Sequence, residues 1–127
     1  MPEALEIDEI ALVRLKRRSE YVFVRHGQSE RRRTVVVQAR RRKGHTHIGI
    51  GFTATKKVGG AVVRNRAKRR LRSAARCLMP VHGVAGTDYV FIARKDTAEV
   101  AWQRLLDDME SALISLASSL SDGAAKA

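Results

Sequence analysis

The segment GGAVVRNRAKRRLRSAAR, at residues 59–76, constrains the fold most strongly because its apolar and basic residues separate at helical spacing. At 100° per residue, its apolar side chains form one stripe along a helix. The stripe contains Val63, Ala67, Leu71, Ala74 and Leu78. Opposite it lie Asn65, Lys68, Arg69, Arg72 and Arg76, and beside it lie Arg64, Arg66 and Arg70. The pattern predicts an amphipathic helix over about 60–79, ended by Pro80, with one face in a core and the other at the surface.

The basic face of this helix has no acidic neighbours. Seven lysines and arginines lie between Arg64 and Arg76, with no aspartate or glutamate among them. Like charges three or four residues apart destabilise a helix by roughly 0.2–0.5 kcal/mol per pair, so a face made only for solubility would include glutamates. A nucleic acid is the favoured partner, because each cation–phosphate contact relieves repulsion and releases counterions. An anionic membrane surface is the alternative, but it needs an exposed apolar face beside the charge.

The basic charge belongs to one block of a chain that is long enough for a single domain. Residues 14–76 contain 21 lysines and arginines and two glutamates, whereas residues 1–13 contain four acidic residues and no basic one. Hydrophobic residues make up 44% of the chain, which is a composition that folds. We predict one domain over 1–127, with a core at about 14–120 and flexible tails at 1–13 and 121–127. The acidic start, the single cysteine and the lack of a membrane-spanning run predict a cytoplasmic protein without a membrane partner.

The other elements follow from residue type and periodicity. Helices are predicted over 14–27 and from Asp96 onward, and strands over 34–39, 46–55 and 88–93. The two strands on either side of Gly44 predict an antiparallel hairpin, and the third, nearly all apolar, is expected to be buried on both faces. Ser19 is a candidate N-cap, and Glu99 forms a capping-box pattern with Asp96. In the last helix, core spacing is kept by Trp102, Leu105, Met109, Leu113, Leu116 and Leu120.

The spaced motifs resemble the bacterial ribonuclease P protein family. The segment GFTATKKVGGAVVRNRAKRRLRSAAR, residues 51–76, is similar to that family's signature: a strand, two lysines, a glycine turn and Arg-Asn-Arg on a helix. RLKRRSEYVFVRHG and VVVQARRR before it, and DYVFIARKDTAEV after it, resemble the family's first helix and its neighbouring strands. The resemblance covers about 14–116. It implies an α+β fold, a small two-layer α/β sandwich of order αβββαβα with a left-handed βαβ crossover.

The resemblance also implies a division of roles between protein and RNA. In this family a catalytic RNA holds the Mg²⁺ ions and removes the 5′ leader from precursor tRNA, with one protein for each RNA. The protein is then expected to contribute no catalytic residue and no metal ligand. The contacts with the catalytic RNA carry over to Arg64, Asn65, Arg66, Lys68, Arg69, Arg70 and Arg72, and Lys56 and Lys57 extend this basic patch. The cleft for the leader carries over to Tyr21, Val24, Gln38 and Thr53.

Two positions of the predicted leader cleft have competing interpretations. Tyr21 is suited to stack on a base of the leader, but its pattern alone favours packing between its helix and the core. Val24 stands where the family has a second aromatic residue, which predicts weaker stacking at that position. Phe23 is adjacent to Val24, but it is expected on a different face of the helix.

Two other functional classes are weighed against an RNA-binding subunit. A stand-alone nucleic-acid-binding protein with a helix-turn-helix would need two adjacent helices, whereas strands flank the basic helix. A protein nuclease with its own active site would need clustered acidic residues in the basic block. Only Glu20 and Glu30 lie there, which is poor material for metal-ion chemistry.

Four smaller motifs predict structural roles. His45 and His47 share one side of a strand, but they lack a third metal ligand. Gly49 and Gly51 lie within a strand and not at a strand-to-helix turn, so they predict close packing or a twisted edge and not dinucleotide binding. Cys77, beside the apolar stripe, is expected to be a small buried residue. Trp102 opens the apolar stripe of the last helix and is expected in the core.

Overall fold

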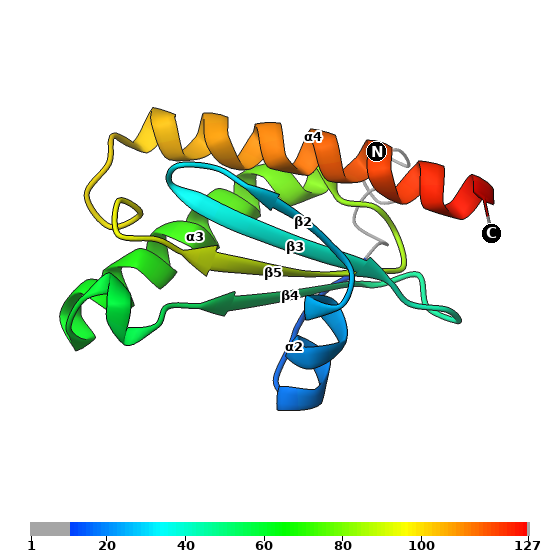
Figure 1. Ribbon diagram of the computed structural model, residues 1–127, viewed down its shortest axis with the longest axis horizontal. Helices are drawn as coiled ribbons and strands as arrows, with labels where there is room; N and C mark the ends of the chain where they lie inside the picture. The colour runs from blue at the N-terminus through cyan, green and yellow to red at the C-terminus, as the bar shows by residue number, and fades with distance from the viewer. Residues whose placement is uncertain (1–10, 127) are drawn as a thin grey trace, which may run out of the picture.

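The computed structural model describes residues 11–126, and its side chains are described through Ser121. The elements form a mixed α/β chain in which one sheet lies between helices (Figure 1). In chain order they are β1 (Leu12–Arg14), α2 (Arg18–Arg25), β2 (Gln28–Arg31), β3 (Val35–Arg41), β4 (Ile48–Thr53), the 3-10 turn η1 (Lys56–Val58), α3 (Ala61–His82), β5 (Thr87–Ala93) and α4 (Trp102–Lys126). From α2 onward the order is αβββαβα, as the resemblance predicts, and β1 is an additional strand before it.

The five strands form one sheet in the order β1-β4-β5-β3-β2. β5 pairs with β3 in antiparallel and with β4 in parallel orientation, so it separates the two strands that were predicted to form a hairpin. The hairpin prediction was therefore wrong. The physical reason is the apolar character of β5: it is almost wholly buried on both faces, as predicted, and only a central position in the sheet provides that burial.

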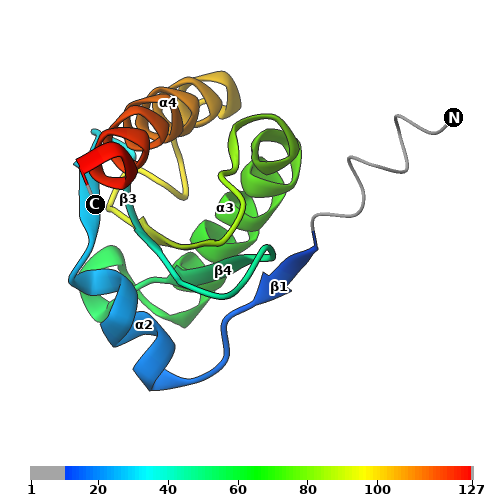
Figure 2. The same cartoon turned by 90° about the vertical axis from the view of Figure 1, so that its right-hand side faces the viewer.

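The helices cover the two faces of the sheet unequally (Figure 2). α3 and α4 pack on one face and form the main core with alternate residues of β3, β4 and β5. α2 lies on the opposite face, where Leu15 and Val24 form a smaller cluster with Val90 of β5. The crossover β4–α3–β5 joins two neighbouring parallel strands, which places α3 over that half of the sheet.

The first helix is shorter than predicted because the residues before it join the sheet. Leu12–Arg14 pair in parallel with Ile48–Ile50 of β4, and the amide of Leu15 donates to the carbonyl of Ile50 at 2.9 Å. The helix starts at Arg18, with Arg17 and not Ser19 at the N-cap position. The carboxylate of Glu20 replaces a serine cap, because it accepts the amides of Lys16 and Arg17 at 2.8 Å each. β2 was not predicted, since its four residues are polar or charged.

The two long helices also differ from their predicted bounds. α3 continues through Pro80 to His82, because a proline removes a single helical donor and the amide of Gly83 still reaches the carbonyl of Met79 at 2.8 Å. α4 begins at Trp102 and not at Asp96, so the capping-box prediction was wrong. The intervening turn is held by Thr97, whose hydroxyl donates to the carbonyl of Thr34 at 2.6 Å. α4 extends through Lys126, where a tail was predicted.

The apolar stripe of α4 is confirmed for five of its six residues. The buried members are Leu105, Met109, Leu113, Leu116 and Leu120. Trp102 keeps 38% of its surface exposed, so its predicted place in the core was wrong. No helix in the described part of the chain is both long and apolar enough to cross a membrane.

Candidate nucleic-acid interface

The amphipathic character of α3 is confirmed. Ala67, Leu71 and Ala74 are fully buried, and Val63 and Leu78 pack against the same cluster while partly exposed. The predicted basic positions lie on the remaining surface of the helix: Asn65, Arg66 and Arg69 are exposed or half-buried, and so are Arg64, Lys68, Arg70 and Arg72. Lys56 and Lys57 are exposed on η1, just before the helix. The structure therefore brings these nine residues onto α3 and the turn that leads into it.

One flank of α3 uses its cations within the protein. The guanidinium of Arg70 donates to the backbone carbonyls of Thr97 and Val100 at 2.7 and 2.5 Å, and it lies 5.8 Å from the ring centroid of Trp102. Arg66 pairs with the carboxylate of Glu99 at 2.5 Å. These contacts hold the turn before α4 against α3. They also explain why Trp102 lies at the surface, where its ring faces a cation.

The cations on the opposite flank of α3 make no such ion pairs within the described part of the chain. Lys68, Arg72 and Arg76 follow one another at four-residue spacing, so they form a row along the helix. Among the described residues, no carboxylate pairs with any of them, nor with Arg64 or Arg69. An unpaired row of cations attracts phosphate groups, because each contact with a phosphate releases counterions.

The second predicted region lies on the sheet face that carries α2. The ring of Tyr21 covers Gly51 so closely that a Cβ atom there would lie 2.7 Å from the ring. Gly49 lies in the same way beneath Leu15 and Asp88. The prediction that these strand glycines allow close packing is therefore confirmed, and it explains how α2 and the residues before it approach the strand.

The four predicted cleft residues differ in accessibility. Val24 is fully buried against Leu15 and Val90, so its side chain offers no surface to a ligand. Tyr21 is half-buried, and its hydroxyl lies 3.5 Å from the carbonyl of Leu15. Gln38 and Thr53 are also half-buried and lie on this same face, in successive cross-strand rows of the sheet: Gln38, Val90 and Gly51 form one row, and Val36, Ile92 and Thr53 form the next. Tyr21, Gln38 and Thr53 are thus brought to one face, and Val24 lies beneath it.

A cluster of arginines beside α2 was not predicted from the sequence. The guanidinium of Arg40 lies 4.2 Å from the ring centroid of Phe23, and that of Arg42 lies 5.0 Å from it. Arg42 also pairs at 2.7 Å with Asp88, whose side chain is only 3% exposed. The available signal was Asp88 itself: a lone acidic residue that opens an apolar strand must find a cationic partner when it is buried.

Two ionisable groups in the described part of the chain have shifted pKa values, and both make structural contacts. The backbone amides of Arg17 and Lys16 lower the pKa of Glu20, since they hydrogen-bond to its charged form. Burial raises the pKa of Tyr89, whose hydroxyl accepts the amide of Val84 at 3.0 Å. Both groups serve the fold: Glu20 caps α2, and Tyr89 anchors the turn before β5.

The described residues contain no group of three or more His, Cys, Asp or Glu side chains placed to hold a metal ion. His45 and His47 pack edge to face, with ring centroids 4.6 Å apart. Cys77 is exposed, so its predicted burial was wrong. The neighbouring residue Leu78, and not Cys77, continues the apolar stripe of α3.

A helix with an unpaired cationic flank packs on one face of the sheet, and a tyrosine with polar side chains lies on the other, which is an arrangement typical of nucleic-acid-binding proteins. Comparison with known proteins specifies the class. Residues 11–117 match the family described as Ribonuclease P, and the chain belongs to the bacterial ribonuclease P protein family. The resemblance of the sequence motifs is thereby confirmed.

Individual relatives agree with this assignment. The chain is 49% identical to the ribonuclease P protein component of Caulobacter vibrioides (strain NA1000 / CB15N) over 114 residues, which are 89% of this chain and 76% of that protein. It is 47% identical to the ribonuclease P protein component of Ruegeria pomeroyi over 102 residues, which are 78% of this chain and 82% of that protein. The RNase P protein structures of Staphylococcus aureus and Thermotoga maritima both superpose with TM-scores of 0.68, at 28% and 25% identity. They cover 79% and 80% of this chain, and 91% and 94% of their own chains.

Proposed function

We propose that this chain is the RNA-binding subunit of ribonuclease P, and that with the catalytic RNA it removes the 5′ leader from precursor tRNA in the cytoplasm. The protein binds the catalytic RNA through the unpaired cations of α3 and η1, with one protein for each RNA. It binds the leader on the sheet face beside α2. The family assignment supports the role, and the residues on the two surfaces support the division of contacts.

The observation that carries the proposal is the unpaired cationic surface of α3. A helix with Arg64, Lys68, Arg69 and Arg72 at its surface repels itself unless a polyanion approaches. Structured RNA offers phosphates along its backbone, and each contact releases counterions. The chain neighbours of α3 are η1 and β5, so a helix-turn-helix, which a stand-alone DNA-binding protein of that type would require, is not formed by α3.

We assign the hydrolysis to the RNA, with Mg²⁺ held there. The described residues offer no clustered carboxylates that fit a magnesium site, so this chain contributes positive charge and position. Cations near the RNA reduce phosphate repulsion, which favours the approach of the leader and of Mg²⁺ to the same region. The protein then contributes no catalytic residue and no metal ligand.

Cleavage of precursor tRNA at near-physiological Mg²⁺ and salt tests the proposal. The protein, the catalytic RNA of the same organism and the two together are assayed separately. We expect efficient release of the leader only when both are present. Cleavage by the protein alone, or no effect of the protein on the RNA, would contradict the proposed function.

A further inference from the structure

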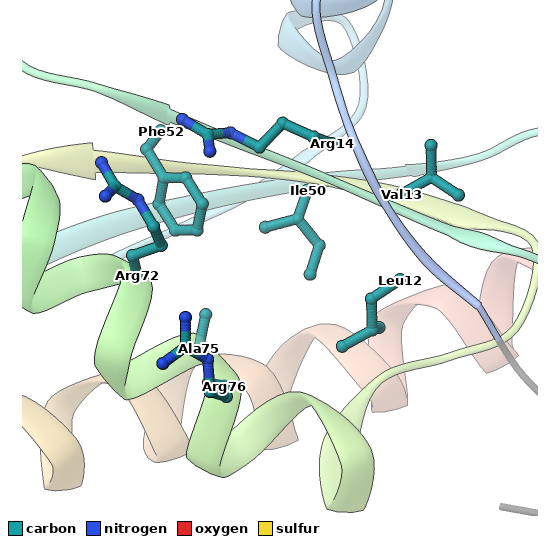
Figure 3. Close-up of a pocket in the computed structure, with 8 residues that line it drawn as sticks. All are labelled: Leu12, Val13, Arg14, Ile50, Phe52, Arg72, Ala75 and Arg76. Carbon is teal, nitrogen blue, oxygen red and sulfur yellow. The ribbon is translucent and has the colours of Figure 1, made fainter. Parts of the chain in front are cut away.

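The strand β1 borders a pocket on the sheet face that carries α3. β1 extends the sheet beyond β4, and its register with Ile48 and Ile50 turns Leu12 and Arg14 toward the face that carries α3. α3 covers β4 and β5 but leaves a hollow of about 240 Å³ between its side and β1 (Figure 3). The hollow is lined by Leu12, Val13, Arg14, Ile50, Phe52, Arg72, Ala75 and Arg76.

Three arginines surround this pocket, and no acidic residue of the described part of the chain lines it. The guanidiniums of Arg14 and Arg72 both lie near Phe52 in Figure 3, and that of Arg14 is 5.6 Å from the ring centroid. The Nε atom of Arg72 is buried and has no hydrogen-bond partner among the described residues. A desolvated donor without a partner is costly, so an anion that accepts from it would be bound favourably.

The floor of the pocket is apolar. Ile50 and Phe52 are nearly buried, and Leu12 and Val13 each keep 43% of their surface exposed. An inorganic anion would leave this floor without a contact, whereas a nucleotide offers a phosphate together with a ribose and a base. The volume is below the roughly 300–1,000 Å³ of pockets that enclose whole small molecules, so the pocket suits one unit of a longer chain.

We propose that this pocket, which we call the β1–α3 pocket, binds a single unpaired nucleotide of the RNA partner. Its phosphate lies among Arg14, Arg72 and Arg76, and its ribose or base lies on the floor formed by Leu12 and Phe52. The inference rests on the proposed function and extends it, because it adds a shaped site to a surface that otherwise acts through charge. Lys68 leads into the pocket along the same row of α3, so the RNA backbone has a continuous cationic path.

Binding of the catalytic RNA across a range of salt concentrations tests the pocket. The test variant is Arg14→Gln with Arg76→Gln, and the matched control is Arg41→Gln with Lys43→Gln, which removes two exposed charges outside the pocket. We expect the pocket variant to bind about tenfold or more weakly than the unaltered protein. Its salt slope should fall by about 0.7 for each single-strand phosphate that the variant no longer neutralises. Equal weakening in the two variants would overturn the proposal, because it would show a dependence on total charge only.

A second measurement reports on the pocket without relying on the catalytic RNA. The side-chain Nε–H signal of Arg72 is followed by NMR while a uridine hexanucleotide is added to the full chain. We expect a saturable shift of this signal and of the Leu12 methyl groups, abolished in the Arg14→Gln, Arg76→Gln variant. A shift with inorganic phosphate but not with the hexanucleotide would overturn the nucleotide assignment.

The outcomes separate this inference from the proposed function. If the unaltered protein supports cleavage of precursor tRNA and the pocket variant binds as tightly as the control, the pocket proposal fails and the function stands. If the unaltered protein does not bind the catalytic RNA, the proposed function fails.

The chain's own acidic residues, Glu3, Glu6, Asp8 and Glu9, are an alternative occupant of the β1–α3 pocket. Neutralising all four would then shift the Arg72 signal of the free protein, and that result would also overturn the proposal.

Discussion

The two flanks of α3 carry the same kind of residue and use it in opposite ways. On one flank, Arg70 donates to two backbone carbonyls and Arg66 pairs with Glu99, so both side chains hold the turn before α4. On the other flank, Lys68 and Arg72 have no carboxylate partner among the described residues. The difference shows that a run of cations is not one functional unit: the neighbouring element decides whether each cation serves the fold or remains available to a ligand.

The largest expected effect is on RNA binding by the unpaired flank. Changing Lys68, Arg69 and Arg72 together to glutamine should weaken binding of the catalytic RNA about 100-fold or more, because three cations no longer neutralise phosphates. The thermal midpoint should change little, since none of the three pairs with a carboxylate in the described part of the chain. Titration of the RNA and thermal unfolding measure the two quantities. An affinity within about threefold of the unaltered protein would contradict the assignment of this flank.

The paired flank should give the opposite result. Arg70→Ala leaves the carbonyls of Thr97 and Val100 without their donor, so the free energy of unfolding should fall by about 2 kcal/mol. Arg69→Ala is the matched control, because Arg69 is the adjacent arginine, is exposed and has no such contact. Urea unfolding of both variants is the measurement. Comparable stability of the two would show that the contacts of Arg70 do not stabilise the fold.

Tyr21 combines the two roles that the flanks of α3 separate, because its side chain packs in the fold and is also partly accessible to a ligand. Its ring covers Gly51, yet the residue is only half-buried, so the fold and a leader base can use different parts of it. Tyr21→Ala should weaken binding of precursor tRNA by about tenfold because stacking is removed, with a smaller effect on mature tRNA. Tyr21→Phe keeps the ring and serves as the control. Equal weakening for both tRNAs would indicate a structural role alone.

The sequence predicts the α3 surface well because periodicity reports which side of a helix faces the core. Ala67, Leu71 and Ala74 are buried as their spacing predicts. It cannot predict which arginines are paired, since the partners of Arg70 lie about 30 residues away, in a turn whose path depends on the whole sheet. The hairpin prediction was wrong for the same reason, because it also depended on a distant part of the chain. Strands adjacent in sequence are expected to pair, but the later and more apolar strand β5 lies between β3 and β4.

The predicted leader face shows this limit on a smaller scale. The resemblance places Tyr21, Val24, Gln38 and Thr53 together, and the structure brings three of them to an accessible face. Val24 is buried because the opposite face of β5 needs an apolar cover, and α2 provides it. The β1–α3 pocket was also out of reach, since three residues at the edge of the acidic start carry too little periodicity to predict a strand.

The smallest expected effect is on the free energy of unfolding and concerns Glu20, whose carboxylate accepts two backbone amides at the start of α2. Two backbone amides lower its pKa below the ordinary value of 4.5, so its charged form is favoured in the folded protein. The resulting stability is present above pH 4.5 and is lost as the pH falls through the folded pKa. Glu20→Gln should therefore be less stable than the unaltered protein at pH 7, by less than about 1 kcal/mol because the site is exposed, and the gap should narrow in acid. Urea unfolding at about pH 7 and about pH 3 checks this, and a gap that stayed constant between the two would show that the charge of Glu20 does not cap α2.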